Sequence, residues 1–336
     1  MRQIGLEPES IRIFETLQRL FPALQSDDEV SIPLQLIEEI EGRKQVFDTT
    51  ISKSYEFDFS VCFFHVPAKK GSSVISTFDL KAWDLSGVDF EKLLLLTLKL
   101  CKWSNPRARL VLITDNHFLS NHQLPWLEVI RLNIDASQLM FERVKCMLSG
   151  VLSSLANRPI VYLDSDALVA APLPMHLLSN TDILLTHRQD LLMVPINEGV
   201  IYVNSARQIY TRKFFWRYLA SYLRLFRDER VRKIYPDIRL WRGGQLALNS
   251  IVGGMPRYRD GVRCVGGVNV GLYPTSRMNL SVRSTKYISS SLWDQSPIVH
   301  LKGAAKIASK QFEMVLRERG FYDVINPQGT EAFVLP

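Results

Sequence analysis

The chain has 336 residues, 46% of them apolar, and a formal net charge of +7 at pH 7. This size and composition suffice for a full hydrophobic core, so we expect one main α/β domain with additions. The most apolar run, residues 92–100, is far shorter than the roughly 20 apolar residues that cross a bilayer, and the N-terminus lacks an apolar signal region. Four scattered cysteines without a CxxC pair fit free thiols in a reducing compartment. We therefore expect a cytoplasmic protein with neither a membrane span nor an export signal.

The first part of the chain has a helical pattern. Apolar residues recur at helical spacing over residues 10–20 and more weakly over residues 34–40. We predict a helical N-terminal segment, residues 1–55, that serves as a packing appendage or as a contact for a partner.

From residue 57 onward, short apolar runs alternate with helical patterns. Strands are predicted at residues 57–66, 109–114, 126–132, 159–164, 182–186, 199–204 and 297–301. Helices are predicted at residues 90–102 and 138–157. Strands that alternate with helices of this length form βαβ units. The predicted fold class is therefore α/β, with a mixed, largely parallel sheet of Rossmann type flanked by helices.

The helix predicted at residues 138–157 has the clearest signals. Asp135 and Gln138 resemble a capping box at its start, and a stripe of apolar residues follows at helical spacing. Arg143 lies at the margin of that stripe. An arginine at such a margin either extends to water or reaches a ligand at the edge of the sheet.

A pair of aspartates follows the next apolar run. Asp164 and Asp166 are two residues apart, so in an extended backbone both carboxylates face one side at the carboxyl end of a buried strand. Ligands of open α/β sheets bind at that end. Two neighbouring carboxylates repel each other unless a cation lies between them, so the pair predicts a divalent metal site. The alternative is that Asp164 caps the next turn while Asp166 is solvated.

A second polar motif lies near the end of the chain. His300, in the last predicted strand, is followed by Gly303 and Lys306. A neutral imidazole beside two carboxylates suits Mn²⁺ better than Ca²⁺ or Mg²⁺. Gly303 allows a close approach of the backbone, and Lys306 can bring a positive charge to phosphate oxygens.

Two further short motifs are weak when each is taken alone. Asn197-Glu198-Gly199 precedes an apolar run and fits a turn. Gly244-Gln245, followed by Leu-Ala-Leu-Asn, fits the N-terminus of a helix.

In combination and in this order, the motifs resemble the retaining, GT-A-fold glycosyltransferases of family 8, the galactosyltransferase and glycogenin group. The resemblance covers roughly residues 57–310, and its most specific part is the spacing His300-x-x-Gly303-x-x-Lys306 after an upstream Asp-x-Asp. It implies that Asp164, Asp166 and His300 hold Mn²⁺, or Mg²⁺ in its place.

The resemblance also implies which residues bind the donor and which lie at the reacting sugar. The implied donor and cofactor contacts come from Lys306, Gly303, Asp164 and Arg143, and the implied catalytic residues are Gln245, Asn197 and Arg143. Lys306 would contact the diphosphate and Arg143 the sugar. Gln245 would lie near the reacting sugar, but an amide is a poor nucleophile. We therefore expect the acceptor hydroxyl to attack from the face that the leaving group vacates.

The function implied is that of a hexosyltransferase-type glycosyltransferase, Mn²⁺-dependent and retaining, with a UDP-sugar as donor. The acceptor would be a carbohydrate, a glycolipid or a protein. The catalytic domain is expected at residues 56–320, followed by a C-terminal tail at residues 321–336.

The chain departs from the family pattern at one position. The family has an Asp-Gln pair facing the donor sugar, whereas this chain has Gly244-Gln245. The carboxylate that would bind sugar hydroxyls is therefore missing, or it is supplied by another residue such as Asp190 or Glu198.

Two other functions remain open. A catalytically degenerate nucleotide-sugar-binding module would explain Gly244. A phosphatase of the haloacid dehalogenase type also places Asp-x-Asp after an apolar strand, but it expects Thr or Val where this chain has Leu168, and a later acidic pair that we do not find.

The positive charge is concentrated in one stretch. Residues 207–242 contain eleven Lys or Arg and three acidic residues, a local balance of +8 that exceeds the net charge of the whole chain. Aromatic residues recur among these arginines. We predict a basic helical insertion at residues 206–242 that packs on the core, or that docks the protein peripherally on an anionic membrane or acceptor. Nucleic acid is not expected as a partner, because no nucleic-acid-binding fold accompanies the charge.

Overall fold

The computed structural model describes residues 32–51, 56–66, 90–115, 124–188, 195–236, 238–239, 242–253, 260–282, 291–302, 309–318 and 320. Its strands are β1 (Phe59–Phe64), β2 (Ala108–Asp115), β3 (Leu127–Leu132), β4 (Ile160–Asp164), β5 (Ala167–Val169), β6 (Ile183–His187), β7 (Ile196–Val203), β8 (Gly261–Val265), β9 (Val268–Pro274), β10 (Leu280–Val282) and β11 (Ile298–Leu301). Its α-helices are α2 (Leu34–Thr50), α4 (Phe90–Ser104), α5 (Leu139–Leu152), α6 (Gln208–Arg227), α7 (Glu229–Ile234), α8 (Gly243–Ile251), α9 (Thr275–Met278), α10 (Leu292–Gln295) and α11 (Ser309–Glu318).

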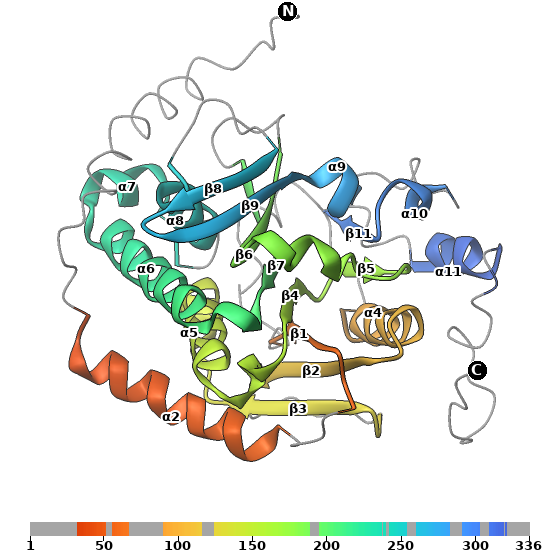
Figure 1. Cartoon of the computed structure of the whole chain (residues 1–336), viewed down its shortest axis with the longest axis horizontal. Helices are drawn as coiled ribbons and strands as arrows, with labels where there is room; N and C mark the ends of the chain where they lie inside the picture. The colour runs from red at the N-terminus through yellow and green to blue at the C-terminus, as the bar shows by residue number, and fades with distance from the viewer. Residues whose placement is uncertain are drawn as a thin grey trace, which may run out of the picture.

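Eight of the strands form one mixed sheet in the order β3-β2-β1-β4-β7-β6-β9-β8 (Figure 1). Strands β3, β2, β1 and β4 run parallel to one another, and β7 is antiparallel to both of its neighbours. A second sheet of three strands has the order β10-β11-β5. Each strand predicted from the sequence matches one of these strands, and the α/β fold class with a mixed sheet is confirmed.

Helices cover both faces of the large sheet because its strands are apolar on both sides. In β1, Cys62 faces one hydrophobic cluster, while Val61 and Phe63 face the other. The first cluster lies under α2, α5, α6 and α8, which gather on the left in Figure 1. The second cluster lies under α4 and the small sheet. Alternate residues of a strand are thus buried on opposite faces, as expected for parallel strands between two layers.

Helix α2 is longer than the sequence pattern predicted and packs on α5. Ile40 and Phe47 are fully buried in the shared cluster. The Arg43 guanidinium, itself buried, pairs with Glu142 of α5 at 2.5 Å. Because both charges are buried, each needs the other as a partner. The pair therefore orients α2 on the helix that carries Arg143. The helix predicted at residues 10–20 and the tail at residues 321–336 lie outside the described residues.

The helix predicted at residues 138–157 is divided into three parts. A 3₁₀ turn at Ala136–Gln138 precedes α5, and a second one at Ser154–Asn157 follows it. Asp135 caps the first turn, since its side chain accepts a hydrogen bond from the backbone N–H of Ser137 at 2.9 Å. The apolar stripe is buried as predicted, but Asp135 caps the 3₁₀ turn and not α5, which has no side-chain cap and ends at Leu152.

The basic stretch forms α6 and α7, and four aromatic residues of α6 belong to the core. Phe214, Phe215, Tyr218 and Tyr222 are at most 1% exposed and lie in the cluster shared with α5 and α8. The face of α6 that carries them packs against these helices. No helix in the described part of the chain is both long and apolar enough to cross a membrane.

Candidate metal and donor site

The Asp-x-Asp pair lies where the large sheet meets the small one. Asp164 is the last residue of β4, residues 165–166 form a turn, and β5 begins at Ala167. His300 lies opposite Ala167 in the antiparallel pair of β11 and β5. The two aspartates are therefore joined by a turn rather than by the extended backbone expected from the sequence. The turn still directs both side chains toward His300.

The three predicted ligands converge. The Nε2 atom of His300 lies 2.9 Å from an Asp166 carboxylate oxygen and 3.3 Å from an Asp164 oxygen. One ligand atom from each residue can be chosen so that all three lie within 4.8 Å of one another. His300 is fully buried and Asp166 nearly so, while Asp164 remains partly exposed. Two carboxylates and an imidazole in this arrangement fit Mn²⁺ or a similar borderline ion.

A positive charge already lies beside these ligands. The ammonium group of Lys302 is 2.6 Å from His300 Nε2 and 4.0 Å from an Asp164 oxygen. The position next to the imidazole nitrogen therefore favours a cation. A divalent metal ion would carry more positive charge there than the ammonium group does. This arrangement of donors, with a cationic group drawn toward them, fits the metal that the sequence implies.

Arg143 does not extend to water. Its side chain is 4% exposed, and one guanidinium nitrogen lies 2.6 Å from an Asp164 oxygen. The other nitrogen donates to the backbone carbonyl of Glu198 at 3.0 Å. Burial alone would raise the pKa of the Asp164 carboxyl, but the charge of Arg143 and a hydrogen bond from His300 outweigh it and hold that pKa below its usual range. Asp164 is thus kept ionised beside the other two ligands.

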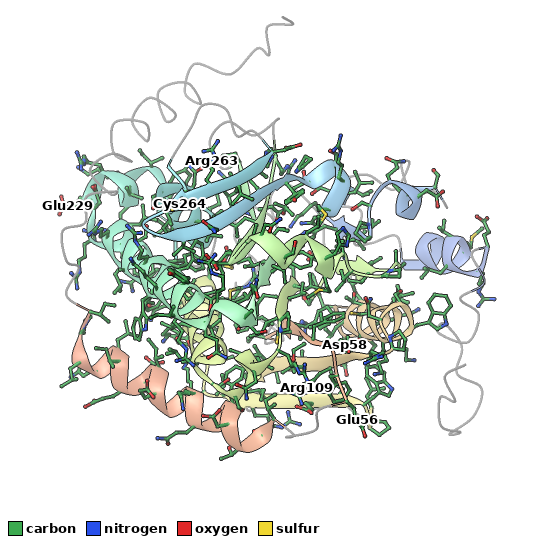
Figure 2. The ribbon with its side chains drawn as sticks, in the orientation of Figure 1. Glu56, Asp58, Arg109, Glu229, Arg263 and Cys264 are labelled. Carbon is green, nitrogen blue, oxygen red and sulfur yellow. The ribbon has the colours of Figure 1, made fainter. Side chains whose placement is uncertain are left out.

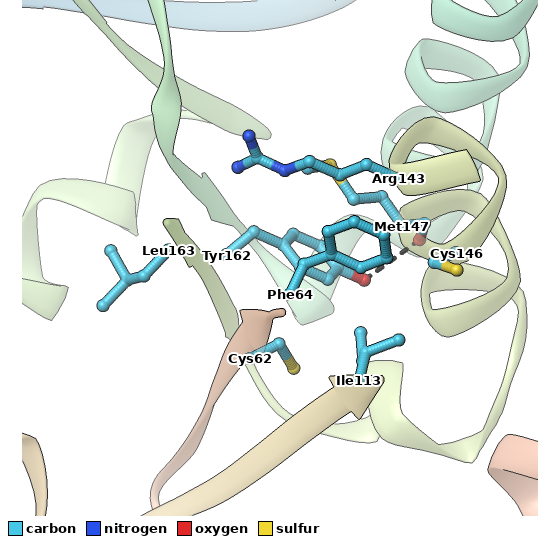
Figure 3. Close-up of a pocket in the computed structure, with 8 residues that line it drawn as sticks. All are labelled: Cys62, Phe64, Ile113, Arg143, Cys146, Met147, Tyr162 and Leu163. Carbon is cyan, nitrogen blue, oxygen red and sulfur yellow. Dashed lines mark hydrogen bonds between the residues drawn. The ribbon is translucent and has the colours of Figure 1, made fainter. Parts of the chain in front are cut away.

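The surroundings of Arg143 explain why it is fixed. Its aliphatic part borders a small cavity that is also lined by Ile113, Met147 and Leu163 (Figure 3). In Figure 3 the guanidinium points away from Met147 and Ile113, and the Tyr162 hydroxyl donates to the Met147 carbonyl at 3.0 Å. An arginine in apolar surroundings must pair its charge, so Asp164 and the Glu198 carbonyl hold it in one orientation.

The Asn197-x-Gly199 motif lies against the ligands. The Asn197 side chain is buried, and its oxygen accepts a hydrogen bond from the Gly199 N–H at 2.8 Å. A Cβ atom at Gly199 would collide with both His300 and Asp164. Gly199 is therefore required for the close approach of β7 to the ligand side chains. Asn197 holds the backbone of this glycine and is not itself shown in contact with the ligands.

The remaining predicted site residues are only partly described. Gln245 lies in the first turn of α8 and is partly exposed, with Gly244 buried before it. Gly303, Lys306 and Asp190 lie outside the described residues, so their predicted roles stay predictions.

Some polar residues at this edge were missed in the sequence. His65 follows β1, Asp115 ends β2, and Lys302 follows β11. Burial lowers the pKa of His65 to about 4, against the opposing charges of Asp115 and Asp166, so its imidazole is neutral. The available signal was the position of His65 near the end of one predicted strand and of Asp115 directly after another, because carboxyl ends of parallel strands share one edge.

Comparisons with known proteins find similarity among solved structures. No protein-family model matches the chain, and no curated protein sequence matches it. The solved glycosyltransferase GlyE of Streptococcus pneumoniae TIGR4 is 13% identical over 82% of this chain and 67% of its own, with a TM-score of 0.41. The galactosyltransferase LgtC, solved with donor and acceptor sugar analogues, is 12% identical over 76% of this chain and 95% of its own, with a TM-score of 0.42.

A third similar structure belongs to a larger protein. The bifunctional glycosyltransferase WbbM is 10% identical over 80% of this chain, which spans about half (53%) of the WbbM chain, with a TM-score of 0.43. All three solved structures are of glycosyltransferases. Similarity at this level transfers no residue's role.

Proposed function

We propose that the protein is a metal-dependent glycosyltransferase that moves a sugar from a UDP-sugar to an acceptor hydroxyl. The observation that carries the proposal is the convergence of Asp164, Asp166 and His300 on one point, with the Lys302 ammonium beside them. The site lies at the carboxyl end of β4, the edge where open α/β sheets bind their ligands. A cation held there would supply the positive charge that an anionic diphosphate needs.

In this proposal each residue has a defined task. Asp164, Asp166 and His300 would hold Mn²⁺, which when bound supplies positive charge to the diphosphate oxygens. Arg143 keeps Asp164 ionised and oriented, since the two groups are 2.6 Å apart. Gly199 and Asn197 keep the backbone of β7 close to the ligands. Lys306 would add a charge to the diphosphate, and front-face attack by the acceptor hydroxyl would retain the anomeric configuration.

Hydrolysis of a panel of UDP-sugars with and without Mn²⁺ tests the function. We expect Mn²⁺-dependent release of UDP from at least one hexose donor, and transfer to a carbohydrate, glycolipid or protein acceptor. Binding of UDP and Mn²⁺ without turnover of any donor would instead identify a degenerate binding module. Absence of UDP binding would remove the transferase proposal, and release of phosphate from a phosphomonoester would favour the phosphatase.

Replacing Lys306 with alanine is expected to weaken UDP binding by about 1–3 kcal/mol, the value of one charge-assisted hydrogen bond to a phosphate. Calorimetric titration of UDP in the presence of Mn²⁺ measures it. Lys213→Ala, which removes an exposed lysine of α6, is the matched control and should bind UDP as the wild type does. An unchanged affinity in Lys306→Ala would show that Lys306 does not contact the diphosphate.

The exposed charge of α6 and α7 leads to a separate proposal about location. Because Phe214, Phe215, Tyr218 and Tyr222 of α6 are buried, the side chains that this stretch exposes are chiefly basic: Lys213, Arg227, Arg230, Arg232 and Lys233. Glu229, which lies at the periphery of the molecule in Figure 2, is an exposed acid among them. We propose that this surface binds an anionic membrane electrostatically, without insertion of aromatic side chains.

Co-sedimentation with vesicles that contain anionic lipid tests this surface. We expect binding at low salt and release at high salt, because each basic residue near the membrane contributes about 1 kcal/mol and salt screens it. The variant R227E/R232E/K233E should lose binding, whereas R158E, a reversal at an exposed arginine elsewhere, should keep most of it. Salt-independent binding, or none by the wild type, would contradict the proposal.

A further inference from the structure

The carboxylate of Glu198 is buried next to the predicted metal ligands. Glu198 lies in β7 and is 1% exposed. The pairing of β6 with β7 passes from Leu185–Ile201 directly to Thr186–Asn197, so residues 198–200 are left out of that ladder. Irregularities of this kind often redirect side chains beside active sites. Here the irregularity places Glu198 between the sheet and the helices α5, α6 and α8.

Only one oxygen of Glu198 has a partner among the described residues. Its Oε1 accepts a hydrogen bond from the Tyr218 hydroxyl at 2.8 Å and lies 4.0 Å from the Arg143 guanidinium. Its Oε2 is shielded from solvent and forms no hydrogen bond within the described part of the chain. Burial raises the pKa of Glu198, although Arg143 and Tyr218 oppose the shift. A buried acceptor without a donor is costly, so a ligand that brings a hydroxyl would stabilise it.

Gly244 provides the space for this carboxylate. A Cβ atom at position 244 would overlap both oxygens of Glu198, so the backbone at the start of α8 lies directly on the carboxylate. The N-terminal turn of a helix carries partial positive charge and favours an anion there. Position 244 is also where the family pattern has an aspartate. A carboxylate from β7 therefore fills the space that a side chain from α8 would otherwise occupy.

The Glu198 carboxylate lies close to the surface where a donor would bind. Gln245 follows Gly244 and is partly exposed. Asp164 is partly exposed as well, and it lies 2.6 Å from the same Arg143 nitrogen that is 4.0 Å from Glu198 Oε1. A ligand that covers Gln245 and Asp164 therefore comes close to Glu198.

We propose that Glu198 is the residue that selects the transferred sugar, by accepting a hydrogen bond from one of its hydroxyls through Oε2. The inference rests on the proposed function, because it assumes that a UDP-sugar binds at Asp164, Asp166 and His300. A sugar offers several hydroxyl donors, and a site that buries an acceptor for one of them rejects analogues that lack it. Tyr218 and Arg143 hold the carboxylate in place for this contact.

The test combines changes in the protein with changes in the sugar. The probes are the UDP-hexose that the wild type hydrolyses fastest and its four analogues with one hydroxyl replaced by hydrogen. The proteins are the wild type, Glu198→Gln, Glu198→Ala and the double variant E198A/G244D, which moves the carboxylate to the start of α8. Position 244 can accept aspartate when the Glu198 side chain is absent, since its backbone has no positive φ. Thermal melting checks that each variant is folded.

We expect Glu198→Ala and Glu198→Gln to lose about 10- to 100-fold in kcat/KM with the intact donor, the effect of losing one hydrogen bond to a charged group. One deoxy analogue should lower kcat/KM of the wild type by a similar factor. It should not lower kcat/KM of Glu198→Ala further, because the two changes remove the same contact. The double variant should regain most of the lost activity. UDP binding in the presence of Mn²⁺ should stay within about twofold of the wild type in all variants.

The inference is overturned if every deoxy analogue slows Glu198→Ala as much as it slows the wild type, or if Glu198→Ala keeps full activity. A purely structural role would lower the melting temperature and the rate for all donors alike, and would leave the pattern among analogues unchanged. Failure of the proposed function is a different result, since the wild type itself would then bind neither UDP with Mn²⁺ nor any UDP-hexose.

Discussion

Replacing His300 with alanine is expected to lower Mn²⁺-dependent turnover of a UDP-sugar by about a thousandfold, since charge compensation by a metal is worth several kcal/mol. His300 is fully buried, and its Nε2 atom is within 3.3 Å of both aspartates. Without the imidazole, two carboxylates remain to hold the cation, and the Lys302 ammonium is free to pair with them instead. Asp166→Ala should have a similar effect for the same reason.

The measurement is turnover as a function of Mn²⁺ concentration, together with thermal melting in the absence of metal. His176→Ala, at an exposed histidine of the 3₁₀ turn Met175–Asn180, is the matched control and should resemble the wild type. Loss of a ligand should leave the fold largely intact, because the hydrophobic clusters do not depend on the histidine. Near wild-type turnover by His300→Ala at limiting Mn²⁺ would show that His300 is not a ligand.

The convergence of Asp164, Asp166 and His300 could be predicted from the sequence because short apolar runs place them at strand ends or within strands. Asp164 ends one such run and His300 lies in another, so both were expected at strand ends or within strands. The path between the aspartates could not be predicted in the same way. A residue pair two apart points to one side in a strand, but residues 165–166 form a turn whose geometry depends on β5 pairing with β11, 130 residues further along the chain.

The contact between Glu198 and Gly244 could not be predicted from the sequence. Each residue has an unremarkable local sequence, one before an apolar run and the other at a helix start. Their relation arises only because α8 packs on β7. Sequence alone could name Glu198 as one replacement for the missing carboxylate, beside Asp190, but could not show that Gly244 leaves room for it.

Strands that were not predicted have identifiable reasons. β5 and β10 have three residues each, too short for a periodic pattern. β8 and β9 form a hairpin about Gly266 and Gly267, both with positive φ, and this Gly-Gly turn was a usable signal. Phe214, Phe215, Tyr218 and Tyr222 lie on the buried face of α6. Their burial follows from packing against α5 and α8, which periodicity does not reveal.

Replacing Gly199 with alanine is expected to reduce Mn²⁺-dependent turnover by about a hundredfold or more, the usual cost of misplacing reacting groups by about 1 Å. The φ angle of Gly199 is not positive, so the backbone accepts alanine without strain. The effect therefore comes from the added methyl group, which would collide with His300 and Asp164 and push the ligands apart. Both side chains are held by other contacts, Asp164 by Arg143 and His300 by β11, and cannot move independently.

Gly42→Ala is the control for the same chemical change. A Cβ atom at Gly42, within α2, meets nothing within 4 Å, so alanine there should leave turnover unchanged and stabilise the fold by about 0.5–1 kcal/mol through its higher helix propensity. Turnover, Mn²⁺ affinity and thermal melting of both variants separate loss of metal binding from loss of folding. If Gly199→Ala binds Mn²⁺ and turns over donor like the wild type, the ligands have room at β7 and the metal does not lie where His300 and Asp164 meet that strand.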